Sequence, residues 1–150
     1  MNSSPSITDF PFILEMPTRL LDNAGGHLNH SVVVAFYDYA VAALCDEYGL
    51  PPNDKHYGRL VRVLNAEYLS PIAGWPNPVQ IGVGVHKLGR SSVEFSFGLF
   101  QSGNIAQSIG RAVHVFMDKT TGTPDPEAIP IALRRKLEAM ALGNTIESRL

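Results

Sequence analysis

The sequence has almost no excess charge of either sign and only one cysteine. Its 150 residues include 12 Lys and Arg against 14 Asp and Glu, a formal net charge of −2. This balance argues against nucleic acid as a partner, because nucleic-acid binding calls for a basic surface. Cys45 has no second cysteine with which to form an internal disulfide. We therefore expect a reducing compartment, the cytoplasm.

Long apolar runs and targeting signals are also missing. The most apolar segment, residues 32–45, is interrupted by Asp38 and is too short to span a bilayer, so no membrane partner is expected. The first residues, MNSSPSITDFPF, contain neither the basic nor the apolar region of a secretory signal. Without an internal repeat or a linker, the chain is expected to form one domain over residues 1–150.

One long helix is predicted over residues 31–48. Asp38 is its only charge between Val32 and Cys45, so the helix lacks a polar face and is expected inside the protein. Gly49, followed by two prolines, is typical of a helix end. A second, amphipathic helix is predicted over residues 130–142 on the surface, followed by Gly143.

The remaining segments predict β-strands. They lie at residues 10–21, 58–69, 79–86, 93–99 and 105–118, with a tight hairpin turn at 102–104. One face of the last strand carries only small residues, which would let the helix approach closely: Ala106, Ser108, Gly110 and Ala112. The order predicts an α+β fold in which four strands in meander and a first strand form an antiparallel sheet wrapped around a long central helix. Long sheet edges favour pairing with a second copy.

Four segments, taken in order, carry a family resemblance. They read AGGHLNHSVVVAFYDYA (24–40), AEYLSPI (66–72), KLGRSSVEFSF (87–97) and GRAVHVFMDKTTGTPDP (110–126). From about Thr18 to Leu137 the chain resembles the hotdog-fold acyl-CoA thioesterases, the group that includes 4-hydroxybenzoyl-CoA thioesterase. The resemblance implies hydrolysis of an acyl-CoA to free acid and CoA by a homodimer or homotetramer, with no cofactor beyond the CoA of the substrate. The first turn of the central helix would polarise the thioester carbonyl.

The family's loop before the helix has the pattern Asp-x-Asp, and its second Asp acts as base or nucleophile. An ungapped match places that second Asp at Asn23. A one-residue gap instead matches Asp22 to the first Asp of the pattern, and the second Asp then falls on Ala24 or is lost. Three interpretations stay open: Asp22 takes the role, His30 or His27 acts as base with Asn23 as hydrogen-bond donor, or hydrolysis is weak or lost. If the ungapped match holds, the exchange Asn23→Asp would raise turnover.

Further candidates would bind the substrate. Gly26 and Asn29 belong to a Gly-His-x-Asn pattern in the same loop, and a second turn would contact the phosphates and pantetheine of CoA through Lys87, Arg90, Ser91 and Ser92. The two loop histidines lack a third ligand, so no metal site is predicted. Asp38 is expected to pair with a partner group across a dimer or with a core hydroxyl. His56, His86 and His114 are interpreted as surface or strand residues.

Two rival functions remain. One is an acyl-CoA-binding protein in which hydrolysis is weak or lost. The other is a hydratase or dehydratase acting on acyl thioesters, although its usual motifs, a His followed by Gly and Pro or an Asp-x-Asn-Pro-x-His run, do not occur here.

Overall fold

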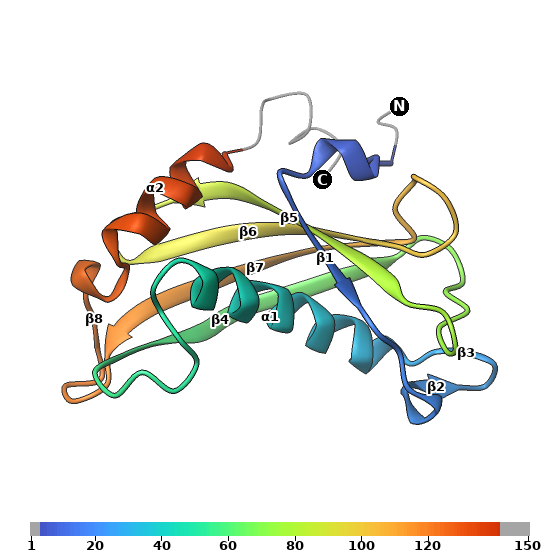
Figure 1. Cartoon of the computed structure of the whole chain (residues 1–150), viewed down its shortest axis with the longest axis horizontal. Helices are drawn as coiled ribbons and strands as arrows, with labels where there is room; N and C mark the ends of the chain where they lie inside the picture. Colours follow the sequence, from blue (N-terminus) through green and yellow to red (C-terminus); the bar gives the residue numbers. More distant parts are fainter. Residues whose placement is uncertain (1–3, 142–150) are drawn as a thin grey trace.

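A curled antiparallel sheet with a long helix across its inner face dominates the computed structural model, which describes residues 4–141 (Figure 1). The end predicted for the second helix, Leu142 and Gly143, lies outside the described residues. The sheet order is β1-β5-β6-β7-β4, and every pair is antiparallel. Its strands are β1 (Phe12–Met16), β4 (Tyr57–Tyr68), β5 (Val79–Leu88), β6 (Ser92–Phe100) and β7 (Ser108–Asp118).

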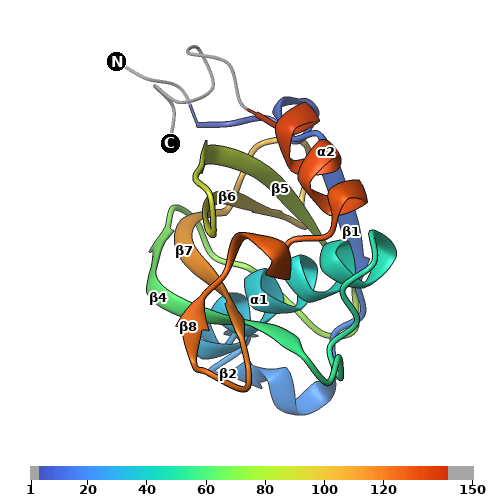
Figure 2. The same ribbon diagram turned by 90° about the vertical axis from the view of Figure 1, so that its left-hand side faces the viewer.

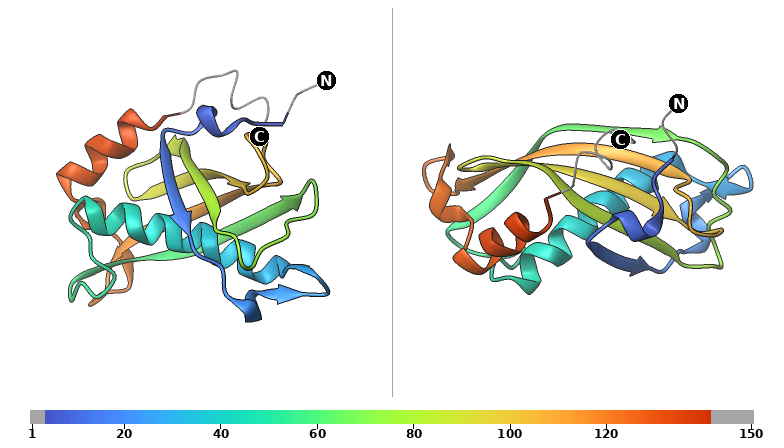
Figure 3. Two further views of the ribbon diagram at one scale, coloured as in Figure 1. Left: turned by 45° about the vertical axis from the view of Figure 1, so that its right-hand side comes forward. Right: turned by 90° about the horizontal axis from the view of Figure 1, so that it is seen from above.

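The helix α1 (His30–Glu47) crosses the inside of the sheet, and α2 (Ile131–Ala139) packs near β5 (Figures 2 and 3). This is the hotdog arrangement, so the predicted α+β class is confirmed. The short elements are η1 (Ile7–Asp9), η2 (Leu20–Asp22), β2 (Asn23–Ala24), β3 (His27–Leu28), β8 (Thr123–Pro124) and η3 (Pro126–Ala128).

The predicted four-strand meander is wrong in one respect. Only β5, β6 and β7 form a meander, while β4 pairs with β7 at the far edge of the sheet. The reason is the length of the connection between β4 and β5. Residues 69–78 are too many for a tight hairpin, and they let the chain cross from one edge of the sheet to the β1 side.

The buried side chains of α1 lie on one face of the helix. The lack of a polar face in the sequence predicts burial on all sides, and the structure differs from this prediction. Its fully buried positions recur at helical spacing, and Tyr39 on another face is 54% exposed. The buried set is Val33, Phe36, Tyr37, Ala40, Val41, Leu44 and Cys45. The helix therefore packs tightly on the sheet while its other side stays partly open.

Close approach of α1 depends on small residues in β7, as predicted. A Cβ atom added to Gly110 would lie 2.8 Å from the ring of Tyr37. The Tyr37 hydroxyl donates to the Ser108 Oγ at 2.7 Å, and the Tyr37 ring stacks on Phe97 with centroids 4.7 Å apart. The row of small side chains on β7 thus makes room for one large aromatic residue, Tyr37.

Two predicted strands are shorter than expected. The first begins at Phe12 because Phe10 leaves the strand and packs over Gly82, where an added Cβ would lie 2.6 Å from its ring. The last begins at Ser108 and not at 105. The side chain of Gln107 accepts hydrogen bonds from the backbone N–H groups of residues 101 and 102, which holds the preceding segment as a wide turn.

Replacing Tyr37 by Phe would leave the fully buried Ser108 hydroxyl without its donor. We expect Tyr37→Phe and Ser108→Ala each to lower the free energy of unfolding by about 1–3 kcal/mol, measured by urea denaturation. The double variant removes both partners and should lose less than the sum of the two single losses. Strictly additive losses would show that this pair does not hold α1 to β7.

Candidate active site

The turn before α1 is a two-residue hairpin that glycine alone adopts without strain. Gly25 and Gly26 connect β2 to β3 with φ angles of +60° and +83°. Asn29 then caps the helix, because its Oδ1 accepts from the Ser31 backbone N–H at 3.0 Å. Gly26 and Asn29 therefore have a structural role in this turn, which does not depend on a bound substrate.

Asp22 lies at the end of η2 and is only 2% exposed. Its Oδ2 accepts from the Arg19 backbone N–H at 2.8 Å, and its Oδ1 lies 2.9 Å from the Arg19 guanidinium. The side-chain hydrogen bond from Arg19 holds the pKa of the Asp22 carboxyl below its ordinary value. A carboxylate enclosed in this way stabilises the turn, and the geometry does not favour it as a base for water.

Asn23 connects the turn to the segment that follows β4. Its Nδ2 donates to the Ala73 carbonyl at 3.0 Å, and its Oδ1 accepts from the Trp75 backbone N–H at 3.0 Å. Both ends of the amide are therefore in use, and the position needs a donor as well as an acceptor. An amide meets both requirements, whereas a carboxylate at this position would have no hydrogen to donate to the Ala73 carbonyl.

A cleft of about 360 Å³ opens at the amino end of α1. Tyr68 closes one side of it, since its hydroxyl donates to the His30 carbonyl at 2.7 Å and its ring meets the His30 ring edge-on at 6.2 Å. We call this space the α1 cleft; its lining residues are His27, Leu28, Tyr68, Leu69, Ser70, Pro71 and Ile72. His27 therefore lines the cleft directly, whereas His30 is linked to it through Tyr68. Tyr68 had no assigned role, although the AEYLSPI segment contains it.

The candidate CoA-binding turn lies at the opposite end of the sheet. Residues 87–92 span the end of β5, the connecting turn and the start of β6. The first eight residues of β5, about 25 Å of strand, run from this turn to the other end of the sheet, where the α1 cleft lies (Figure 1). Arg134 of α2 donates to the carbonyls of Gly89 and Arg90 at 3.3 and 2.5 Å. Within one chain, Lys87, Arg90, Ser91 and Ser92 therefore do not meet the loop residues.

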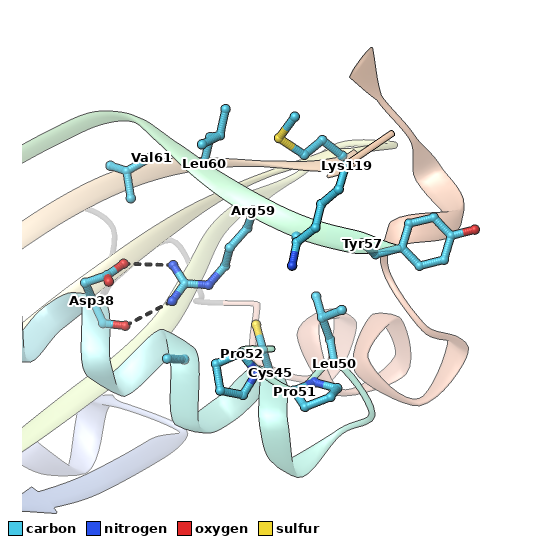
Figure 4. A pocket seen from close by; sticks show the side chains of 13 residues that line it. Asp38, Cys45, Leu50, Pro51, Pro52, Tyr57, Arg59, Leu60, Val61 and Lys119 are labelled. Atoms are coloured by element: carbon cyan, nitrogen blue, oxygen red, sulfur yellow. Dashed lines mark hydrogen bonds and ion pairs between the residues drawn. The ribbon is translucent and has the colours of Figure 1, made fainter. Parts of the chain in front are cut away.

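Asp38 finds its partner within the chain. Arg59 of β4 donates through Nη1 to the Asp38 Oδ1 at 2.8 Å, and the same nitrogen lies 2.9 Å from the His114 Nδ1 (Figure 4). His114 lies on strand β7, one of the two places expected for it, and it is not a surface residue, because it is only 1% exposed. Burial, with Arg59 beside it, lowers the pKa of His114 to about 4, and the neutral ring can accept from Arg59.

This polar group borders a second cavity, of about 380 Å³, which we call the α1–β4 cavity. It lies between the second half of α1, residues 50–52 and the start of β4 (Figure 4). Its lining residues are Asp38, Ala42, Cys45, Leu50, Pro51, Pro52, Tyr57, Gly58, Arg59, Leu60, Val61, Met117 and Lys119. No pattern in the sequence indicated this space, because it forms only when β4 crosses α1.

Among residues 4–141, no group of three or more His, Cys, Asp or Glu side chains is placed to hold a metal ion. Within the same residues, no helix is both long and apolar enough to cross a membrane.

The exchange Asn23→Asp keeps the acceptor for Trp75 and turns the donor for Ala73 into a second oxygen facing a carbonyl. We therefore expect the free energy of unfolding to fall by about 1 kcal/mol, measured by urea denaturation, with no gain in thioester turnover. Asn29→Asp is the matched control, because Asp caps a helix as well as Asn does. An Asn23→Asp variant that is as stable as the parent and hydrolyses faster would contradict this structural role.

Solved structures of similar fold include thioesterases. The PA5185 protein from Pseudomonas aeruginosa strain PAO1 is 32% identical over 93% of this chain and 98% of its own, with a TM-score of 0.86. A thioesterase from Thermus thermophilus complexed with coenzyme A and Zn is 26% identical over 88% of this chain and 95% of its own, with a TM-score of 0.69. A predicted thioesterase from Bacillus stearothermophilus shares the fold at 21% identity over 87% of this chain and 96% of its own, with a TM-score of 0.73.

The comparison with curated protein sequences gives no significant match. The family model of the thioesterase superfamily matches residues 25–106, which is more than half of the 150 residues. The match runs from the glycine turn through α1 and β6 almost to the start of β7. The chain therefore belongs to the thioesterase superfamily, whose general reaction is the hydrolysis of a thioester.

Proposed function

We propose that this protein hydrolyses acyl-CoA thioesters to the free acid and CoA. The observation that carries the proposal is the α1 cleft, a space at the amino end of a long helix that is lined by His27 and by Tyr68, the residue that contacts His30. The Thermus thermophilus thioesterase of the same fold was solved with coenzyme A, which supports a CoA thioester as the substrate. The free thiol of Cys45 agrees with a cytoplasmic location.

The amino end of α1 would stabilise the transition state. The backbone N–H of His30, the first residue of α1, has no acceptor within the helix, and the helix dipole adds positive partial charge there. A thioester carbonyl placed in the α1 cleft would direct its developing negative charge at this donor. Tyr68 holds the turn in position through its bond to the His30 carbonyl.

A histidine would activate the water. As water attacks the carbonyl carbon, its proton passes to the imidazole of His27 or His30, and the carbon–sulfur bond then breaks. The leaving CoA thiolate takes that proton from the imidazolium, and the acid loses its own proton to water and leaves as a carboxylate. An imidazole suits this step because it changes charge near neutral pH. Asp22 and Asn23 are engaged elsewhere in the turn.

These contacts of Asp22 and Asn23 also support one alternative function. Neither Asp22 nor Asn23 offers a free carboxylate in the α1 cleft, so a protein that binds acyl-CoA and hydrolyses it weakly or not at all has the same geometry. Turnover against ligand-induced stabilisation separates the two functions.

A homodimer would complete the site. β4 is the last strand of the sheet, so one of its edges is unpaired, and it carries exposed apolar side chains. Leu60, Val61, Val63 and Leu64 are 58%, 42%, 53% and 39% exposed. Antiparallel pairing of two β4 strands would set the partner's 87–92 turn and its α1–β4 cavity at the same end as this chain's α1 cleft. Lys87, Arg90, Ser91 and Ser92 would then reach CoA bound at the neighbouring cleft.

Purified protein given a panel of acyl-CoAs should release CoA thiol, which a thiol reagent detects. We expect His27→Gln or His30→Gln to lower kcat/KM at least tenfold, because one of these rings takes the proton from water. His56→Gln, an exposed residue outside the cleft, is the control and should have no effect. If no acyl-CoA is turned over while CoA raises the Tm, the protein binds and does not hydrolyse.

Val63→Lys places a charge on the exposed face of β4, where lysine opposes edge-to-edge pairing. We expect light scattering to show a monomer where the parent protein is at least a dimer, and we expect turnover to be lost with it. Leu21→Lys is the control, since Leu21 is 90% exposed and lies on η2, away from β4. A Val63→Lys variant that remains dimeric would exclude β4 as the interface.

A further inference from the structure

The α1–β4 cavity has apolar walls and a cationic end. Ala42, Leu50, Pro51 and Val61 contribute hydrocarbon, whereas the charged lining residues are Asp38, Arg59 and Lys119. Figure 4 shows the side chains of Arg59 and Lys119 descending from the strand layer into the space above residues 50–52. The lining thus has two cations and one carboxylate, a formal charge of +1.

Arg59 is held rigidly at this end. Its side chain is 16% exposed, and its guanidinium contacts the Asp38 carboxylate at 2.8 Å, the Asp38 carbonyl at 3.4 Å and the His114 ring at 2.9 Å. Because the neutral His114 adds no charge, Asp38 alone balances Arg59. The guanidinium is therefore pre-organised, which lowers the entropy lost on binding a ligand.

Lys119 supplies the second cation. Its Nζ donates to the backbone carbonyl of Asp54, whose own carboxylate accepts from the N–H groups of His56 and Tyr57 at 3.0 and 2.8 Å. The hydrogen bond that Lys119 makes is therefore with a neutral carbonyl, and the Asp54 carboxylate acts on the ammonium only as a nearby charge. A ligand carboxylate in the cavity would offer this ammonium a stronger, charge-assisted hydrogen bond.

We propose that the α1–β4 cavity receives the end of the acyl group remote from the thioester, and that Arg59 and Lys119 select acyl groups ending in a carboxylate. This inference rests on the proposed hydrolysis and on the pairing of two β4 strands, which sets the cavity of one copy beside the α1 cleft of the other. The methylene chain would lie on Ala42, Leu50 and Val61. An acyl chain ending in a methyl group would displace water from the Lys119 ammonium and offer it no hydrogen-bond acceptor in return.

The test compares two substrates of equal chain length, hexanoyl-CoA and adipoyl-CoA, on the intact protein. We expect kcat/KM to be about tenfold higher for adipoyl-CoA, which corresponds to roughly 1.4 kcal/mol. The preference should shrink as KCl is raised, because salt screens the ion pair. Lys119→Met should reduce or reverse the preference, and Lys119→Arg should keep it. Lys55→Met, an exposed neighbour outside the lining, is the matched control.

Binding separates this inference from the proposed reaction. Calorimetry with two non-hydrolysable CoA thioethers, one ending in a carboxylate and one in a methyl group, measures the selection without turnover. Tighter binding of the carboxylate form, lost in Lys119→Met, supports the inference even if no acyl-CoA is hydrolysed. Equal binding of the two thioethers, or a preference that Lys119→Met leaves unchanged, overturns it whether or not hydrolysis occurs.

Discussion

The packing of α1 against the inner face of the sheet is the constraint on which the other features depend. Tyr37 reaches the sheet because Gly110 has no side chain, and its hydroxyl is satisfied by Ser108. This contact fixes how closely α1 packs on the sheet. With the helix in this position, its amino end lies at the α1 cleft and its second half borders the α1–β4 cavity.

Arginine pairs with a carboxylate in the turn before α1 and with another on α1 itself. Arg19 encloses Asp22 in the turn before α1, and Arg59 holds Asp38 on the helix. The Arg19–Asp22 pair is structural, since the Asp22 carboxylate is buried and accepts a hydrogen bond from the backbone of the same turn. The second pair borders a cavity, so it can also take part in recognition. Both carboxylates are thus engaged, which is why the proposed base at the α1 cleft is a histidine.

Much of the fold followed from patterns of side chains. The alternation of Val79, Ile81, Val83 and Val85 predicted β5, and all four are buried. The stripe of small residues predicted the helix seat on β7. The roles of the site residues were harder to predict, because those of Asp22 and Asn23 were inferred from an alignment with the loop of a family. Asp22 bonds to Arg19, three positions away, whereas Asn23 bonds to Ala73 and Trp75. Spacing alone does not reveal contacts with residues fifty positions away.

The sequence by itself determined the fold class, the position of the central helix and the turn that leads into it, because each depends on local periodicity, glycine and capping residues. Only the tertiary structure decided the place of β4, the pairing of Arg59 with Asp38 and His114, and the separation of the 87–92 turn from the α1 cleft. These features arise where distant segments meet across the sheet. Their energies come from burial and charge pairing, which do not depend on neighbours in the chain.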